Sequence, residues 1–155
     1  MTAKLCCDVL NALQGKTLVT AESLTGGGIG SALTAISGSS AVYKGGIISY
    51  TNWVKENVLG VDGNVLETHG AVSAPVAKAM AEGARRALKA DVAVSVTGLA
   101  GPGGDDYGNP VGTVFIGYAD DSQTAVKQYA FAGNREEIRN QTIAEALKQI
   151  LRYNK

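Results

Sequence analysis

The sequence predicts an α/β fold: a three-layer α/β/α sandwich around a mixed, mostly parallel sheet. Helical spacing of apolar residues alternates with short β-branched runs along most of the chain. Near the carboxyl end, two such runs are separated only by Asp120-Asp121-Ser122, which predicts a hairpin. Alternating helices and strands followed by a hairpin indicate a mixed sheet that helices cover on both faces.

The first half of the chain predicts three helices and two strands. Leu5, Val9 and Leu13 recur at intervals of four and predict an amphipathic first helix, and Ile29 and Leu33 show the same spacing in the second. The elements predicted here are a helix over 3–13, a strand over 16–22, a helix that starts near Thr25, a buried strand over 45–50 and a short helix within 51–60.

The second half predicts two helices and three strands. Pro75 falls in the first turn of one helix, where proline is tolerated, and Asn134 with Glu137 resembles a capping box. The predicted elements are a turn-rich connection over 62–73, a helix over 73–90, strands over 91–97, 111–119 and 124–131, and a final helix that begins after Asn134. No internal repeat or linker interrupts this order, so we expect one domain over residues 1–155.

The overall composition restricts the class of protein. The chain has 155 residues, 45% of them hydrophobic, and its 14 basic and 14 acidic residues cancel. A balanced charge argues against a nucleic-acid partner, whereas the apolar content permits a homo-oligomer. Cys6 and Cys7 are adjacent, which fits neither a disulfide nor a metal site. No signal peptide or membrane span is recognisable, so we expect a cytoplasmic protein without a membrane partner.

Glycine is strongly enriched. The chain has 20 glycines in 155 residues, against an average of about 7%, and many gather at 26–30, 45–46 and 98–108. Glycine inside a helix costs roughly 1 kcal/mol of stability relative to alanine, so we expect these positions to require a backbone without side chains. Ligands of open α/β sheets bind outside the carboxyl ends of strands. We therefore expect the glycine-rich segments after strands to approach a ligand.

The stretch VTAESLTGGGIGS, residues 19–31, matches none of the common nucleotide-binding or hydrolase motifs. It lacks the third glycine of G-x-G-x-x-G, and the chain contains no P-loop and no G-x-S-x-G. What remains is Ser23 at a strand-to-helix turn, with a helix amino terminus behind it that suits a phosphate or an oxyanion. Simple helix capping is the alternative for this serine.

A nucleophilic serine needs a base, and the only histidine, His69, lies in a turn-rich segment. Lys55 is the next candidate, because burial or nearby positive charge can remove its proton. Tyr50 ends the preceding strand and Lys55 lies about one turn into the next helix, so both can reach the crevice at Ser23. An exposed surface lysine is the alternative.

The second glycine-rich segment and the last helix supply further candidates. Residues 97–104, TGLAGPGG, could wrap a phosphate or ribose with backbone amides, with a tight structural turn as the alternative. Arg135 and Arg139 share a helix face and could bind an anionic group, or be solvated. No further ligand pattern accompanies Asp105 and Asp106, so we expect a solvated loop there and no metal.

Several ordered segments together resemble the CinA carboxy-terminal domain family, which includes stand-alone nicotinamide mononucleotide deamidases. The resemblance covers nearly the whole chain and rests on TAESLTGG, GSSAVYKGGIISYTNWVK, LGV, HGAVS, SVTGLAGPGG, PVGTVFIG and GNREEIR. The usual family pattern around the serine is A-E-S-C-T-G-G. Leu24 replaces the cysteine here, a change that bears on local packing rather than on chemistry.

The resemblance implies an amidohydrolase that converts nicotinamide mononucleotide to nicotinate mononucleotide and ammonia, with a pyridine nucleotide as its partner and no cofactor. It assigns catalysis to Ser23, Tyr50 and Lys55. It places substrate-binding positions at Thr25, Gly26, Gly27, Thr97, Gly98, Gly101, Gly103, Arg135 and Arg139. The family domain also occurs fused to a larger amino-terminal domain, so a non-catalytic nucleotide-binding or regulatory role is the alternative.

Overall fold

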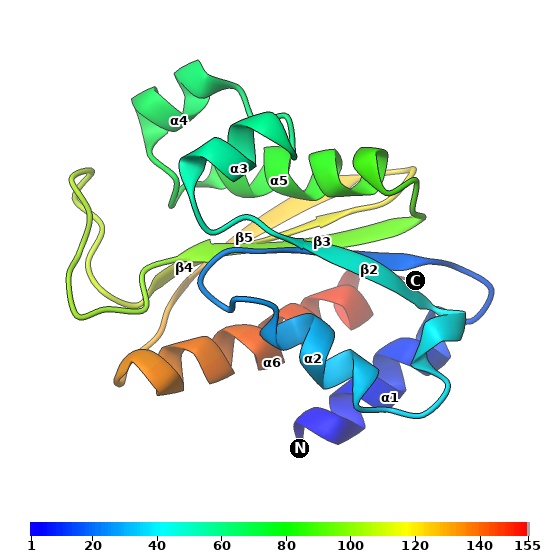
Figure 1. The fold of residues 1–155 in the computed structure, drawn as a ribbon. Helices are drawn as coiled ribbons and strands as arrows, with labels where there is room; N and C mark the ends of the chain where they lie inside the picture. The colour runs from blue at the N-terminus through cyan, green and yellow to red at the C-terminus, as the bar shows by residue number, and fades with distance from the viewer. Residues whose placement is uncertain (155) are drawn as a thin grey trace.

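A five-stranded mixed sheet forms the centre of the fold in the computed structural model, which describes residues 1–154 (Figure 1). The strands lie in the order β2-β1-β3-β4-β5. β2, β1 and β3 run parallel, β4 pairs antiparallel with β3, and β5 pairs antiparallel with β4. All strands except β4 therefore share one direction, which confirms the predicted mixed, mostly parallel sheet. The bounds are β1 Leu18–Glu22, β2 Tyr43–Ile48, β3 Val92–Gly98, β4 Thr113–Ala119 and β5 Thr124–Ala130.

Helices cover both faces of the sheet and complete the predicted three layers (Figure 1). One face carries α1 (Thr2–Ala12), α2 (Gly28–Thr34) and α6 (Arg135–Tyr153), and the other carries α3 (Asn52–Asn57), α4 (Gly63–His69) and α5 (Ala74–Ala87). A short 3-10 helix spans Ser39–Ala41 between α2 and β2. No helix within residues 1–154 has the length and apolar character that crossing a membrane requires.

The central strands are buried on both faces because helices pack on each. In β1, Leu18 belongs to the apolar cluster under α1, α2 and α6, whereas its neighbour Val19 belongs to the cluster under α5. Val94 and Ala93 of β3 divide in the same way. Strands covered on both faces need apolar residues at nearly every position, which explains why Val92, Ala93, Val94 and Val96 of β3 are all apolar and buried.

The start of α6 is fixed by the capping box that the sequence predicts. The Asn134 side chain accepts a hydrogen bond from the Glu137 N–H, and the Glu137 carboxylate accepts one from the Asn134 N–H. Two of the free amides at the helix start are thereby satisfied. Arg135, the first residue of α6, consequently has a defined position at the edge of the sheet.

The strand expected to be buried over 45–50 is instead the edge strand β2, and that expectation is wrong. Its residues alternate between half-buried and exposed positions. A short apolar run can form either a central strand or an edge strand. Which of the two it becomes depends on strand pairing between residues distant in sequence. The second helix also begins later than expected, at Gly28 rather than near Thr25.

The turn-rich connection expected over 62–73 contains the helix α4, which the sequence analysis missed. The Asp62 side chain caps this helix by accepting a hydrogen bond of 2.8 Å from the Asn64 N–H. Leu66 is buried in the apolar cluster under α5. A helix of this length is marginal alone, so its packing on α5 stabilises it.

The carboxyl ends of β1, β2 and β3 meet at one edge of the sheet because the three strands are parallel. The register pairs Glu22 of β1 with Ile48 of β2 and with Val96 of β3. The segments that follow these strands, including the one that begins at Ser23, therefore meet at this edge.

Gly83 allows α5 to approach the α3–α4 connection closely. A Cβ at this position would overlap the carbonyl oxygen of Leu59. Alanine normally stabilises a helix relative to glycine by about 1 kcal/mol, but overpacking costs about 1–3 kcal/mol. We expect Gly83→Ala to lower the free energy of unfolding, measured by denaturant titration. A variant as stable as the parent would contradict this close packing.

Candidate active site

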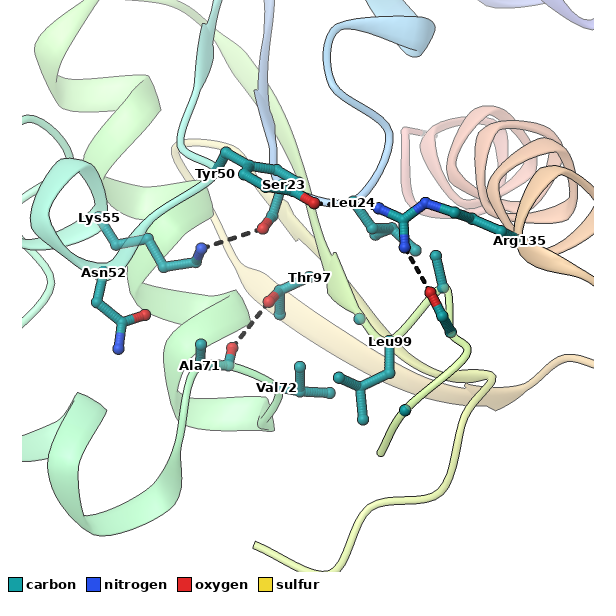
Figure 2. A pocket seen from close by; sticks show the side chains of 14 residues that line it. Ser23, Leu24, Tyr50, Asn52, Lys55, Ala71, Val72, Thr97, Leu99 and Arg135 are labelled. Atoms are coloured by element: carbon teal, nitrogen blue, oxygen red, sulfur yellow. Dashed lines mark hydrogen bonds between the residues drawn. The ribbon is translucent and has the colours of Figure 1, made fainter. Parts of the chain in front are cut away.

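A pocket opens at the edge of the sheet where the segments after β1, β2 and β3 meet the start of α6 (Figure 2). Its volume is about 310 Å³. Its polar lining comes from Ser23, Tyr50, Asn52, Lys55, Thr97 and Arg135, and its apolar lining from Leu24, Ala71, Val72, Leu99 and Ala100. The mixture fits a small ligand that has both an apolar part and polar or charged groups.

Lys55 and Ser23 form a direct polar pair in this pocket. The Lys55 amine donates hydrogen bonds to Ser23 Oγ over 3.0 Å and to the carbonyl oxygen of Ser49 over 2.7 Å. Figure 2 shows the amine reaching from α3 toward the serine hydroxyl. Lys55 is 1% exposed and Ser23 is 7% exposed. The structure therefore brings together the serine and the lysine that the sequence expects in one crevice.

Burial without an ionic partner sets the charge state of Lys55. The ion pairs within residues 1–154 are Lys4–Asp8 and Lys148–Glu145, so no carboxylate neutralises the Lys55 amine. Removing an amine from water disfavours its charged form. Burial accordingly lowers the pKa of Lys55 from 10.5 to about 8. The neutral amine, which can accept a proton, is therefore well populated at mildly alkaline pH.

Ser49 connects the lysine to the end of β1, directly before Ser23. The Ser49 N–H and hydroxyl donate to the Glu22 carbonyl oxygen over 2.7 and 3.3 Å, while the Ser49 carbonyl accepts from Lys55. Ser49 is fully buried. These bonds hold the end of β2, and with it the Lys55 amine, against the end of β1.

The backbone around Ser23 is also fixed. The Ser23 N–H donates to the Val96 carbonyl and the Ser23 carbonyl accepts from the Gly26 N–H, both over 3.1 Å. The Leu24 N–H makes no hydrogen bond to residues 1–154, and Leu24 lines the pocket. The N–H that follows a nucleophile is a common oxyanion donor, and this one is available for that role.

The Glu22 carboxylate binds the first amides of α2, the place where the sequence analysis expects an anionic ligand. Glu22 is 2% exposed, and the carboxylate accepts from the Ile29 and Gly30 N–H groups over 2.8 and 3.0 Å. A carboxylate at this place satisfies the free amides and the positive end of the helix dipole from within the protein. The Ile29 and Gly30 amides are therefore not free to bind the phosphate or oxyanion that the sequence suggests at this helix start.

Tyr50 and Arg135 lie together on another side of the pocket. Arg135 donates one hydrogen bond to the Tyr50 hydroxyl over 3.1 Å and another to the Gly101 carbonyl. The Tyr50 ring is 58% exposed. Both acceptors of the guanidinium are neutral, so its positive charge remains available to an anionic group of a ligand.

The remaining predicted substrate-binding residues divide into two groups. Those that line the pocket are Thr97, Gly98, Gly101 and Gly103. Those outside its lining are Thr25, Gly26, Gly27 and Arg139. Arg139 donates to the carbonyls of Leu24 and Thr25 over 2.9 and 3.1 Å. It therefore holds the turn after Ser23 in place and, unlike Arg135, does not line the pocket.

The end of β3 and the glycine-rich segment after it are hydrogen-bonded to the α4–α5 connection. The Thr97 hydroxyl donates to the Ala71 carbonyl over 2.8 Å, and the Asn109 amide donates to the Val72 carbonyl over 3.1 Å. The Asp105 carboxylate accepts from the backbone of Tyr107 and Asn109, each over 3.0 Å. No group of three or more metal-ligating side chains occurs within residues 1–154. Asp105 thus organises the loop that forms one wall of the pocket.

Three residues of the site are missing from the sequence-based candidates: Glu22, Ser49 and Asn52. Glu22 carries a usable signal, because a carboxylate at the end of a buried strand needs buried hydrogen-bond donors. Ser49 and Asn52 flank Tyr50 and Thr51 in a short polar stretch. Nothing local marks Ser49, whose role depends on the register between β1 and β2.

Comparison with known families and sequences gives one consistent result. The model of the CinA C-terminal domain family matches residues 2–154. A "CinA-like protein" of Synechococcus sp. (strain RCC307) is 51% identical over 136 residues, which cover 86% of this chain and 33% of that protein. A "Putative competence-damage inducible protein" of Caldanaerobacter subterraneus is 44% identical over 147 residues, covering 94% of this chain and 36% of that protein. The chain thus spans about a third of the length of these curated relatives.

Solved structures match over nearly their full length. The competence/damage inducible protein of Agrobacterium tumefaciens is 39% identical, with a TM-score of 0.96, and the match covers 99% of this chain and 96% of that one. The competence damage-inducible protein A of Klebsiella pneumoniae is 36% identical, with a TM-score of 0.95 and coverage of 98% and 96%.

The burial of Lys55 predicts how stability depends on pH. Below about pH 8 the amine is charged in both the folded and the unfolded chain, so the folded state bears the whole desolvation penalty. Between the folded pKa of about 8 and the unfolded value of 10.5, only the folded state loses the proton, and stability rises. Relative to Lys55→Met, we expect the wild-type unfolding free energy to rise by about 2–3 kcal/mol from pH 7 to pH 10.

The matched control for this measurement is Lys44→Met, which removes an exposed lysine of β2. The difference in unfolding free energy between Lys44→Met and the wild type should stay constant over the same pH range, as measured by denaturant titration. A Lys55→Met difference that is equally independent of pH would show that the Lys55 amine remains hydrated.

Proposed function

Because the chain belongs to the CinA C-terminal domain family, we propose that it is an amidohydrolase that converts nicotinamide mononucleotide to nicotinate mononucleotide and ammonia. The observation that carries the proposal is the buried pair of Ser23 and Lys55, whose polar atoms lie 3.0 Å apart. A lysine of lowered pKa beside a serine in a pocket is the arrangement that serine–lysine catalysis needs. Tyr50, the third proposed catalytic residue, lines the same pocket.

The reaction begins when Ser23 adds to the carboxamide of the substrate. The neutral Lys55 amine accepts the Ser23 proton while Ser23 Oγ attacks the carboxamide carbon. The carbonyl oxygen becomes an oxyanion. The Leu24 N–H, which belongs to the residue directly after Ser23 and makes no hydrogen bond to residues 1–154, is the donor that we propose for it. Removing one such donor typically costs about 3 kcal/mol of barrier, so a single well-placed amide matters.

The adduct then collapses to an ester between the substrate and Ser23, and the two products leave in turn. The proton taken up by Lys55 passes to the departing nitrogen, with the Tyr50 hydroxyl as a carrier, and ammonia leaves as the C–N bond breaks. Water then attacks the ester while Lys55 accepts its proton, and Lys55 returns this proton to Ser23 Oγ as the ester C–O bond breaks, which frees nicotinate mononucleotide. Lys55 therefore acts as base when Ser23 or water attacks and as acid when the leaving group departs, and it returns to its starting state.

The remaining pocket residues suit binding of the rest of the nucleotide. Val72, Leu99 and Ala100 offer an apolar wall for the pyridine ring. Arg135, whose acceptors within the protein are uncharged, offers a cation to the phosphate. The pyridinium charge makes the carboxamide more electrophilic, and the phosphate supplies binding energy away from the reacting bond.

Removal of either member of the serine–lysine pair should abolish hydrolysis. We expect Ser23→Ala and Lys55→Met each to lower kcat by at least about a thousandfold, measured as ammonia release from nicotinamide mononucleotide. Thermal unfolding should show that both variants remain folded, and Lys44→Met serves as the surface control. Wild-type rates in both variants would exclude the mechanism, whereas tight binding without ammonia release by the wild type would indicate the non-catalytic alternative.

Arg135 and Arg139 should have separable effects despite their shared helix. We expect Arg135→Gln to raise KM for nicotinamide mononucleotide by about ten- to a hundredfold, the value of a charged hydrogen bond. The effect should disappear with nicotinamide riboside, which lacks the phosphate. Arg139→Gln should instead lower the free energy of unfolding by about 1–2 kcal/mol. An equal effect of Arg135→Gln on both substrates would place the phosphate elsewhere.

A further inference from the structure

The carboxylate of Glu22 has no part in the proposed chemistry, although it directly precedes Ser23 and is buried. Four donors converge on it, two on each oxygen: Thr25 Oγ1 at 2.7 Å and Ile29 N–H at 2.8 Å on Oε1, and Gly30 N–H at 3.0 Å and Thr20 Oγ1 at 3.2 Å on Oε2. Four donors match the ionised form, which only accepts. A buried charge is costly unless it is fully hydrogen-bonded, and here it is.

The two carboxylate oxygens join different parts of the fold behind the serine. Oε1 accepts a hydrogen bond from the Thr25 hydroxyl, and this bond closes the turn from Glu22 to Thr25 that contains Ser23. Oε2 binds Thr20 of β1, whose hydroxyl is 2.8 Å from the Tyr43 hydroxyl of β2. Burial raises the pKa of Tyr43, so that its hydroxyl stays neutral. One carboxylate therefore links β1, β2 and α2.

The packing around this network leaves little room for rearrangement. A Cβ at Gly30 would lie 2.5 Å from the Tyr43 hydroxyl oxygen. The main-chain carbonyl of Glu22 meanwhile accepts both bonds from Ser49, whose own carbonyl binds the Lys55 amine. The side chain of Glu22 thus fixes the turn that bears the serine, and its main chain fixes the acceptor of the lysine.

We propose that Glu22 is a positioning residue whose ionised carboxylate, bound to Thr25 and to the first amides of α2, holds Ser23 Oγ within reach of Lys55 Nζ. The proposal rests on the serine–lysine hydrolysis proposed above and adds a separate claim about what aligns it. Glu22 is not part of the pocket lining, so it acts on the serine and not on the ligand. A misplacement of about 1 Å can cost about a hundredfold in rate.

The direct test is Glu22→Gln, which keeps the volume but replaces one acceptor oxygen with a donating amide. That amide faces a backbone N–H of α2, which cannot turn away. We expect kcat to fall by about ten- to a hundredfold while KM stays within about twofold, after normalisation to the folded fraction. Glu145→Gln, which removes a carboxylate from a surface ion pair of α6, is the control and should retain the wild-type kcat.

A matched pair at Thr25 separates positioning from general loss of packing. Thr25→Ser keeps the hydroxyl that binds Glu22, whereas Thr25→Val keeps the volume and loses the hydroxyl. We expect Thr25→Val to lose kcat in the same way as Glu22→Gln, and Thr25→Ser to recover most of it. If the loss of kcat in the two variants correlates with their thermal stability and not with the presence of the hydroxyl, the proposal is overturned.

A measurement without substrate distinguishes failure of this inference from failure of the proposed function. The Lys55 Cε resonance is followed against pH in protein with ¹³C-labelled lysine, assigned by its absence in Lys55→Met. Ser23→Ala calibrates the shift of the midpoint when the serine hydroxyl is missing. Glu22→Gln should move the midpoint in the same direction, because the hydroxyl leaves the amine. A wild-type midpoint in Glu22→Gln, with a shifted one in Ser23→Ala, would overturn the positioning role even if the wild type releases no ammonia.

Discussion

The Lys55 amine lies between the Ser23 hydroxyl and the Ser49 carbonyl, in a residue that is 1% exposed, and it has no carboxylate partner among residues 1–154. The rest of the site depends on this placement. α3 has only six residues, too few for a stable helix alone, so tertiary packing must hold it. The α3–α4 connection supplies that packing where the Leu59 carbonyl lies against Gly83 of α5. A backbone contact on the outer layer therefore maintains the environment of a reactive side chain.

The electrostatics of the site are divided between the interior and the pocket. Glu22 provides the anion for the start of α2 from inside the protein, so this helix end offers little attraction to a ligand. Positive charge at the pocket comes from Arg135 and from the protonated fraction of Lys55. An anionic group would therefore be drawn to the Arg135 side, which leaves the serine–lysine pair free to meet an uncharged carboxamide in the proposed reaction.

The sequence predicted features that depend on local patterns, and it missed those that depend on tertiary contacts. The hairpin of β4 and β5 and the capping box at Asn134 follow from neighbouring residues, and both are present. The edge position of β2 and the packing that stabilises α4 depend on distant partners. Ser23 and Lys55 meet because parallel strands end together, which could be anticipated. Arg135 and Arg139 look equivalent four residues apart, yet they reach different acceptors.

The cause of the lowered Lys55 pKa determines how strongly this pKa depends on ionic strength. A lysine whose proton is removed by a neighbouring cation recovers its ordinary pKa as dissolved ions screen that neighbour. Here the cause is the exclusion of solvent by packed side chains, which counter-ions at the surface do not screen. The basicity of this amine should therefore be nearly independent of ionic strength, and changes of packing around α3 would alter it more than salt does.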